Sequence, residues 1–141
     1  MDRFDKFVED LQRQIDEQTR RDYSPRAIEL GQKPENWGRI DDATSSVAYE
    51  GPCGDTMEIF LKIDDDGIIS KISFLTDGCV SSISSGSQAT ILAKGKSVDE
   101  AYKITSDDIL QALGRLPPDS LHCPVLAEKT LKRAIEKYRI Q

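Results

Sequence analysis

Three cysteines and one histidine limit the chemistry that this chain of 141 residues can perform. Cys53, Cys79 and Cys123 each stand beside a glycine, a proline or a histidine, and the single histidine, His122, directly precedes Cys123. An odd number of cysteines argues against a disulfide framework. Thiolates bind soft metals and attack sulfur, so the three positions are candidate metal ligands or nucleophiles.

A carboxylate completes the candidate set, because Asp55 follows Cys53 by two residues. The set of Cys53, Asp55, Cys79, His122 and Cys123 can fill four positions around a metal or cluster, but no four of its members are all sulfur. Carboxylate is a poorer ligand than thiolate for iron–sulfur clusters, so such a site is expected to hold a cluster less firmly than four cysteines would. A lone cysteine is more often a small buried hydrophobe; three that lie together at element ends favour a site.

The composition excludes several classes of protein. Nineteen basic and 25 acidic residues give a formal charge of −6, which argues against a nucleic-acid partner. No apolar run approaches the roughly 20 residues that cross a bilayer, and the N-terminus lacks the apolar core of a secretory leader. We therefore expect a cytoplasmic protein without a membrane partner. A hydrophobic content of 38% supports a small core, and we expect one domain over residues 1–141.

The N-terminal part reads as two helices. Apolar residues recur at helical spacing over 3–21, and we expect this apolar face to pack on the core. These residues are Phe4, Phe7, Val8, Leu11 and Ile15. Ser24 and Pro25 suit the start of a second helix, which ends near Gly31.

The middle of the chain reads as a three-stranded antiparallel meander followed by helices. Strands are expected over 46–50, 57–63 and 68–76, and the turn Asp64-Asp65-Asp66-Gly67 carries an Asp-Gly hairpin pattern. The spacing of the remaining apolar residues predicts helices over 80–94, 98–104, 107–113 and 124–138. Strands followed by helices indicate an α+β fold with the helices packed on one face of the sheet.

This topology places the cysteines at the ends of elements. Cys53 lies in the turn after the first strand and Cys79 at the exit of the third, which are at the same end of a meander. Pro124 suits the first position of a helix, so Cys123 is expected at about the N-cap of the last helix. A helix N-terminus lowers the pKa of a thiol, and this would apply to both Cys79 and Cys123.

Taken together, these motifs resemble the IscU/NifU-type scaffold proteins of iron–sulfur cluster assembly over residues 23–138. Cys-Gly-Asp, Gly-Cys and His-Cys in this order form a highly specific combination. The matching segments are Pro34-Glu35-Asn36-Trp37-Gly38, Gly51-Pro52-Cys53-Gly54-Asp55, Thr76-Asp77-Gly78-Cys79, Gly95-Lys96-Ser97, Leu116-Pro117-Pro118 and Leu121-His122-Cys123-Pro124-Val125-Leu126-Ala127.

The resemblance implies a compact α/β sandwich and a function that is not enzymatic. Such scaffolds receive sulfur as a persulfide from a cysteine desulfurase, assemble a transient [2Fe–2S] cluster and pass it to apo iron–sulfur acceptor proteins. By position, Cys53, Cys79 and Cys123 match the scaffold cysteines, and Asp55 matches the aspartate that keeps the cluster labile. His122 matches the neighbouring histidine, and isolated members often carry zinc at the same ligands.

One departure and two alternatives accompany this resemblance. Asp119-Ser120 stands where many bacterial members have Val-Lys, in the docking motif for a DnaK-type chaperone, so this partner is not carried over. The residues alone also fit a small zinc-binding domain with a structural site. A third interpretation is a thiol sulfurtransferase in which His122 acts as the local base.

Overall fold

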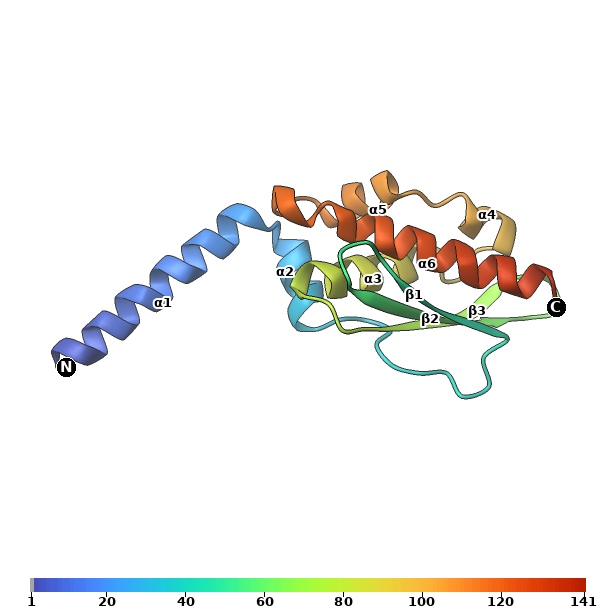
Figure 1. The fold of residues 1–141 in the computed structure, drawn as a ribbon, viewed down its shortest axis with the longest axis horizontal. Helices are drawn as coiled ribbons and strands as arrows, with labels where there is room; N and C mark the ends of the chain where they lie inside the picture. Colours follow the sequence, from blue (N-terminus) through green and yellow to red (C-terminus); the bar gives the residue numbers. More distant parts are fainter. Residues whose placement is uncertain (1) are drawn as a thin grey trace.

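A computed structural model describes residues 2–141 and shows two layers, a three-stranded sheet and a layer of helices on one of its faces (Figure 1). Met1, which the predicted domain includes, lies outside the described residues. Among residues 2–141, no helix combines the length and apolar character needed to cross a membrane. The elements are α1 (Arg3–Asp22), α2 (Pro25–Gln32), β1 (Ser45–Glu50), β2 (Thr56–Ile63), β3 (Ile69–Thr76), α3 (Val80–Ala93), α4 (Val98–Tyr102), α5 (Ser106–Leu113), the 3₁₀ turn η1 (Pro118–Ser120) and α6 (His122–Arg139).

The sheet is the predicted antiparallel meander, with strand order β1-β2-β3. Val47 pairs with Ile59, and Ile59 pairs with Phe74, so one row of apolar side chains crosses the three strands. Ile59 and Phe74 are fully buried against the helices. The Asp64 side chain accepts hydrogen bonds from the backbone of the predicted turn before β3, and Gly67 supplies the positive φ that the turn needs.

Helix α3 approaches the sheet closely because its side chains are small. A Cβ atom at Gly86 would lie 2.6 Å from the Phe74 ring, so only glycine fits where the helix crosses β3. Many α3 serines are fully buried in this contact, among them Ser82 and Ser84. Close packing of this kind holds the N-terminal end of α3, which follows Cys79, at a fixed place on the sheet.

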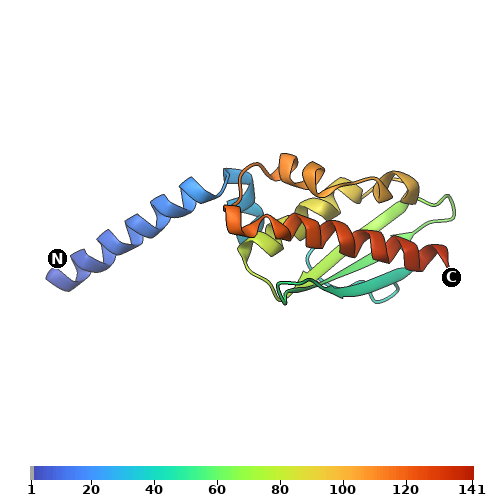
Figure 2. The ribbon, with the colours of Figure 1, turned by 45° about the horizontal axis from the view of Figure 1, so that its top comes forward.

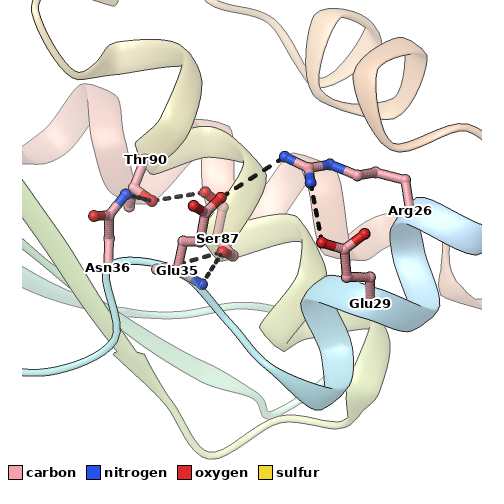
Figure 3. A network of polar contacts seen from close by, with 6 residues as sticks. All are labelled: Arg26, Glu29, Glu35, Asn36, Ser87 and Thr90. Atoms are coloured by element: carbon pink, nitrogen blue, oxygen red, sulfur yellow. Dashed lines mark hydrogen bonds and ion pairs between the residues drawn. The ribbon is translucent and has the colours of Figure 1, made fainter.

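The connection between α2 and β1 fastens α3 from a second side (Figure 3). The Ser87 hydroxyl accepts a hydrogen bond from the Glu35 backbone N–H and donates one to the Glu35 carbonyl, both at 2.9 Å. The Asn36 amide donates to the Thr90 hydroxyl at 3.0 Å, and Arg26 lies 3.8 Å from the Glu35 carboxylate. These contacts satisfy buried hydroxyls that would otherwise destabilise the helix.

Several helix boundaries differ from the predicted ones by one or two residues. Helix α6 begins at His122 instead of residue 124, because η1 and Leu121 already have helical backbone angles and lead directly into it. Cys123 therefore lies inside the first turn, and its predicted N-cap position was wrong. Thr105 caps α5 in a reciprocal arrangement with Asp108, and α4 ends at Tyr102, two residues early.

Helix α1 forms as predicted, but the expectation that it packs on the core was wrong. No residue of α1 is buried, and Phe4 and Phe7 are 71% and 63% exposed. Figures 1 and 2 show the helix projecting away from both layers. The helical face of the sheet is already occupied by α3 and α6, so the apolar stripe of α1 has no site on it.

The C-terminal end of α1 is the part of the helix that is hydrogen-bonded to the rest of the protein. The Arg115 guanidinium donates hydrogen bonds to the backbone carbonyls of Arg20, Arg21 and Tyr23. The Ser24 hydroxyl, just beyond, donates to the Leu113 carbonyl. Orphan carbonyls at a helix end favour a cation, which explains this use of Arg115.

Removing residues 2–17 is therefore expected to leave stability nearly unchanged. Because those residues bury no side chain, the free energy of unfolding in urea should change by less than about 1 kcal/mol. Leu131→Ala, at a fully buried position, is the sensitivity control and should lower it by about 2–5 kcal/mol. A truncation that destabilises as strongly as Leu131→Ala would show that α1 does pack on the core.

Candidate metal centre

Two short hydrogen bonds join the segments that carry the first two cysteines. The Asp77 carboxylate accepts from the Thr56 backbone N–H at 2.8 Å, and the Thr76 hydroxyl donates to the Thr56 carbonyl at 2.7 Å. The turn that contains Cys53 is thereby tied to the segment that leads from β3 to Cys79. Both cysteines lie at the same end of the sheet, as predicted.

The turn from Gly51 to Asp55 has a defined shape. The Gly51 N–H donates to the Asp55 carbonyl at 2.9 Å, and the Gly54 N–H donates to the Gly51 carbonyl at 3.0 Å. Gly54 has a φ of 92°, which is strained for any residue with a side chain. This folded turn directs Cys53 and Asp55 toward the start of α6.

Three of the five predicted residues offer ligand atoms at metal-binding distances from one another. One atom each of Cys53, Asp55 and His122 lies within 4.8 Å of the other two. Cys53 and His122 are exposed, and Asp55 is half-buried. A thiol, a carboxylate and an imidazole therefore share one opening at the surface.

Cys123 lies next to this group and is buried. Its Sγ lies 3.6 Å from Nε2 of His122 and 3.4 Å from the hydroxyl of Ser82. The Ser82 hydroxyl also donates to the Asp55 carboxylate at 3.2 Å. Ser82 thus links the carboxylate to the buried thiol. Sequence analysis did not identify it, although its place one helical turn after Cys79 could have suggested it.

Burial raises the pKa of the Cys123 thiol to about 11. The hydrogen bond with Ser82 favours the thiolate, but nearby negative charge on Cys79, Asp55 and Cys53 raises the pKa further. The pKa of this thiol is thus raised, contrary to the lowering predicted from the helix N-terminus, because loss of hydration outweighs the hydrogen bond with Ser82.

Cys79 occupies the N-cap of α3, as its position before the helix predicted. It is exposed, and its side chain makes no capping hydrogen bond. Cys79 and Cys123 are outside the tightest group of ligand atoms, which consists of Cys53, Asp55 and His122. The structure therefore brings all five residues to one end of the sheet but places Cys79 at the edge of the group.

Gly78, next to Cys79, leaves room for the side chains of Ser82 and Asp55. A Cβ at Gly78 would lie 2.5 Å from the Ser82 hydroxyl and 3.1 Å from Oδ2 of Asp55. A larger residue there would push both polar groups out of place. Three thiols, a carboxylate and an imidazole form a donor set that fits zinc or an iron–sulfur cluster.

Comparison with known proteins places the chain in a family. The family model described as the NifU-like N-terminal domain matches residues 22–141. The chain belongs to the NifU-like N-terminal domain family. The match begins after almost all of α1, the helix that projects from the two layers.

Two curated relatives of this NifU-like chain cover most of its length. The iron–sulfur cluster assembly scaffold protein IscU 1 of Archaeoglobus fulgidus is 44% identical over 117 residues, which are 82% of this chain and 76% of that protein. The iron–sulfur cluster assembly enzyme IscU of Drosophila melanogaster is 42% identical over 123 residues, 84% of this chain and 79% of that protein. Both likenesses agree with the resemblance seen in the sequence.

A solved structure supports the fold of the NifU-like chain. The N-terminal part of a nitrogen-fixing NifU-like protein from Brucella abortus superposes with a TM-score of 0.65 over 84% of this chain and 94% of that one. The two share 16% sequence identity, so the comparison concerns the fold alone. The predicted α+β architecture, a three-stranded antiparallel sheet packed by helices, is confirmed.

The three thiols are expected to differ sharply in reactivity. With iodoacetamide at pH 8, Cys53 and Cys79 should be alkylated at least about tenfold faster than Cys123, because burial hides its sulfur and keeps it protonated. Peptide mass spectrometry over a time course measures the three rates separately. In urea the rates should converge. Equal rates in the folded protein would contradict the burial of Cys123.

Proposed function

We propose that this chain is a scaffold on which a transient [2Fe–2S] cluster is assembled and from which it is transferred to apo-proteins. The observation that carries the proposal is the shared opening of Cys53, Asp55 and His122, with Cys123 3.6 Å from the histidine ring. Thiolate and imidazole are ligands that iron–sulfur clusters accept. The family and the scaffold name of the Archaeoglobus relative support the same function.

The mixed donor set suits a cluster that must leave again. The thiols of Cys53, Cys79 and Cys123 would hold iron, and Asp55 would supply a harder oxygen ligand that matches the cluster less well. Ser82 positions the Asp55 carboxylate and the Cys123 thiol through one hydroxyl. Cys123 must lose its proton when it binds iron, and the adjacent His122 ring nitrogen is placed to take part in that transfer.

The site opens to partners on its exposed side. Cys53 and Cys79 are accessible, as a persulfide donor of the cysteine desulfurase class requires. Apo iron–sulfur acceptor proteins would take the cluster from the same side. A DnaK-type chaperone is not included, because Asp119 and Ser120 depart from its docking motif.

The proposed function has no catalytic step of its own, so the protein is not an enzyme on this account. A cytoplasmic location is part of this proposal. The relatives' names do not favour the structural zinc domain or the thiol sulfurtransferase. Zinc at the same ligands would be a substitute for iron in the isolated protein.

Anaerobic reconstitution with ferrous iron and sulfide tests the proposal. The protein should turn brown and show the visible charge-transfer absorption of a [2Fe–2S] cluster, and Cys53→Ser, Cys79→Ser or Cys123→Ser should each lower the yield. Ser120→Ala, outside the site, is the control. A colourless protein that binds only zinc, and whose melting temperature collapses on chelation, would overturn the proposal in favour of a structural zinc site.

The same reconstituted protein tests the role of Asp55. Asp55→Ala should lengthen the lifetime of the cluster and slow its transfer to an apo-ferredoxin by about tenfold, because the ligand that matches iron least well has gone. Asp65→Ala, at an exposed turn, is the matched control and should leave transfer unchanged. An unchanged rate in the Asp55 variant would contradict its assignment as the residue that keeps the cluster labile.

A further inference from the structure

A row of three cations follows the face of α6 that packs along β1. Lys129, Arg133 and Lys137 are spaced by four residues, so they lie on one side of the helix, and all three are exposed. We call them the α6 cationic row. Such a concentration of positive charge stands out on a chain whose net charge is −6.

The middle and the far end of the row are fixed on β1. The Arg133 guanidinium stacks over the Tyr49 ring at 4.8 Å, and the Lys137 ammonium donates to the Ser46 carbonyl at 3.0 Å. Neither contact uses a carboxylate, so both cations keep their charge available. Within residues 2–141, Lys129 forms no ion pair, whereas its neighbour Lys132 pairs with Glu128 at 3.9 Å. Two members of the row are therefore held in place, and among the described residues no member of the row forms an ion pair with a carboxylate.

Nearby acidic groups leave the row with a net positive charge. Glu128 accepts a hydrogen bond from the Ser106 N–H, and Glu136 accepts one from the Tyr102 hydroxyl. Glu136 also lines a surface hollow with Lys129, Lys132 and Arg133, so it offsets part of the positive charge of the row. Glu50 is exposed at the end of β1, and strand alternation turns it to the face opposite Tyr49. The remaining carboxylate, Asp55, belongs to the metal centre.

A small apolar cavity opens where the row meets the metal centre. It has a volume of about 130 Å³, and we call it the Cys53 pocket. Its lining consists of Tyr49, Gly51, Pro52, Cys53, His122, Val125, Leu126 and Lys129. The volume is that of roughly four waters at about 30 Å³ each, which suits one aliphatic side chain. Lys129 thus belongs both to the pocket and to the row.

We propose that the α6 cationic row and the Cys53 pocket dock an acidic segment of the sulfur-donor protein, with one aliphatic side chain of that segment seated in the pocket beside Cys53. This inference rests on the proposed function for the identity of the donor. Charge complementarity selects an acidic segment, and the apolar lining selects the anchor. Tyr49 lines the pocket, and its ring contacts the Arg133 guanidinium. The pocket and the cationic row therefore form one continuous surface.

The arrangement fits a sulfur donor better than other partners. Of the five site residues, the pocket contains only Cys53 and His122, so a segment docked there reaches one exposed thiol and not the whole centre. A cluster acceptor would need access to all the ligands. Three cations, partly offset by Glu128 and Glu136 on the same helix, are too few to bind the phosphate backbone of a nucleic acid.

Thiol–disulfide exchange with synthetic peptides tests the docking without iron or sulfide. Three peptides of equal length carry a leucine beside a cysteine that is disulfide-bonded to thionitrobenzoate; their flanks are acidic, neutral or basic. The Cys53 thiolate of the Cys79→Ser variant attacks the peptide sulfur, a protein–peptide disulfide forms, and thionitrobenzoate leaves with the electron pair as a coloured thiolate. At low ionic strength the acidic peptide should react about tenfold faster than the basic one.

Charge reversal shows whether the row causes this preference. Arg133→Glu with Lys137→Glu, the two members of the row outside the pocket, should abolish the advantage of the acidic peptide and leave the neutral peptide within about twofold. Lys94→Glu with Lys103→Glu makes the same change in net charge at exposed positions outside α6, and it should preserve most of the preference. Equal rates for acidic and basic peptides, or an equal loss for all three in the row variant, would overturn the proposal.

A second pair of measurements tests the pocket. Replacing the peptide leucine by serine should slow the acidic peptide, and Val125→Phe, which fills the pocket, should remove the difference between leucine and serine. No difference in the parent protein would contradict an aliphatic anchor. Competition by a single-stranded oligonucleotide as strong as by the acidic peptide would contradict a protein partner. Failure here leaves cluster reconstitution unaffected, so the two proposals fail separately.

Discussion

The antiparallel pairing of β2 with both of its neighbours decides where the cysteines meet. Because successive strands reverse direction, the turn after β1 and the exit from β3 must lie at the same end of the sheet. The backbone of Thr56 closes that end by bonding to the side chains of Asp77 and Thr76. Helix α6 then needs only to begin at this end for its first turn to bring His122 and Cys123 beside the other two cysteines.

Burial divides the site into an open and a closed part. Cys53, Cys79 and His122 face solvent, whereas Cys123 is fully buried against Ser82. An open thiol suits exchange with a partner, and a buried thiol adds a ligand that solvent does not reach. Together with the weak oxygen ligand Asp55, this division gives a centre that can bind and release a cluster without unfolding of the surrounding protein.

Local patterns predicted much of this structure, and contacts between distant segments account for the rest. Period-two alternation and the Asp64–Gly67 turn predicted the meander, and therefore the proximity of Cys53 and Cys79. Periodicity also predicted α1, but it does not reveal whether a core surface remains free to receive the helix. Pro124 suits several positions in a first turn, so it could not fix the start of α6. The spacing of Ser82 from Cys79 could suggest that it lies near that cysteine, but its contacts with Asp55 and Cys123 depend on how α3 meets α6.

The central claim is that one metal centre is shared by residues from three separate segments. X-ray absorption spectroscopy of the protein loaded with one zinc ion per chain tests it directly, because it counts the sulfur and the nitrogen or oxygen atoms bound to the metal. The account predicts a mixed set of ligands and the loss of one sulfur in each of Cys53→Ser, Cys79→Ser and Cys123→Ser. Zinc that keeps its full sulfur count in any of these variants would contradict it.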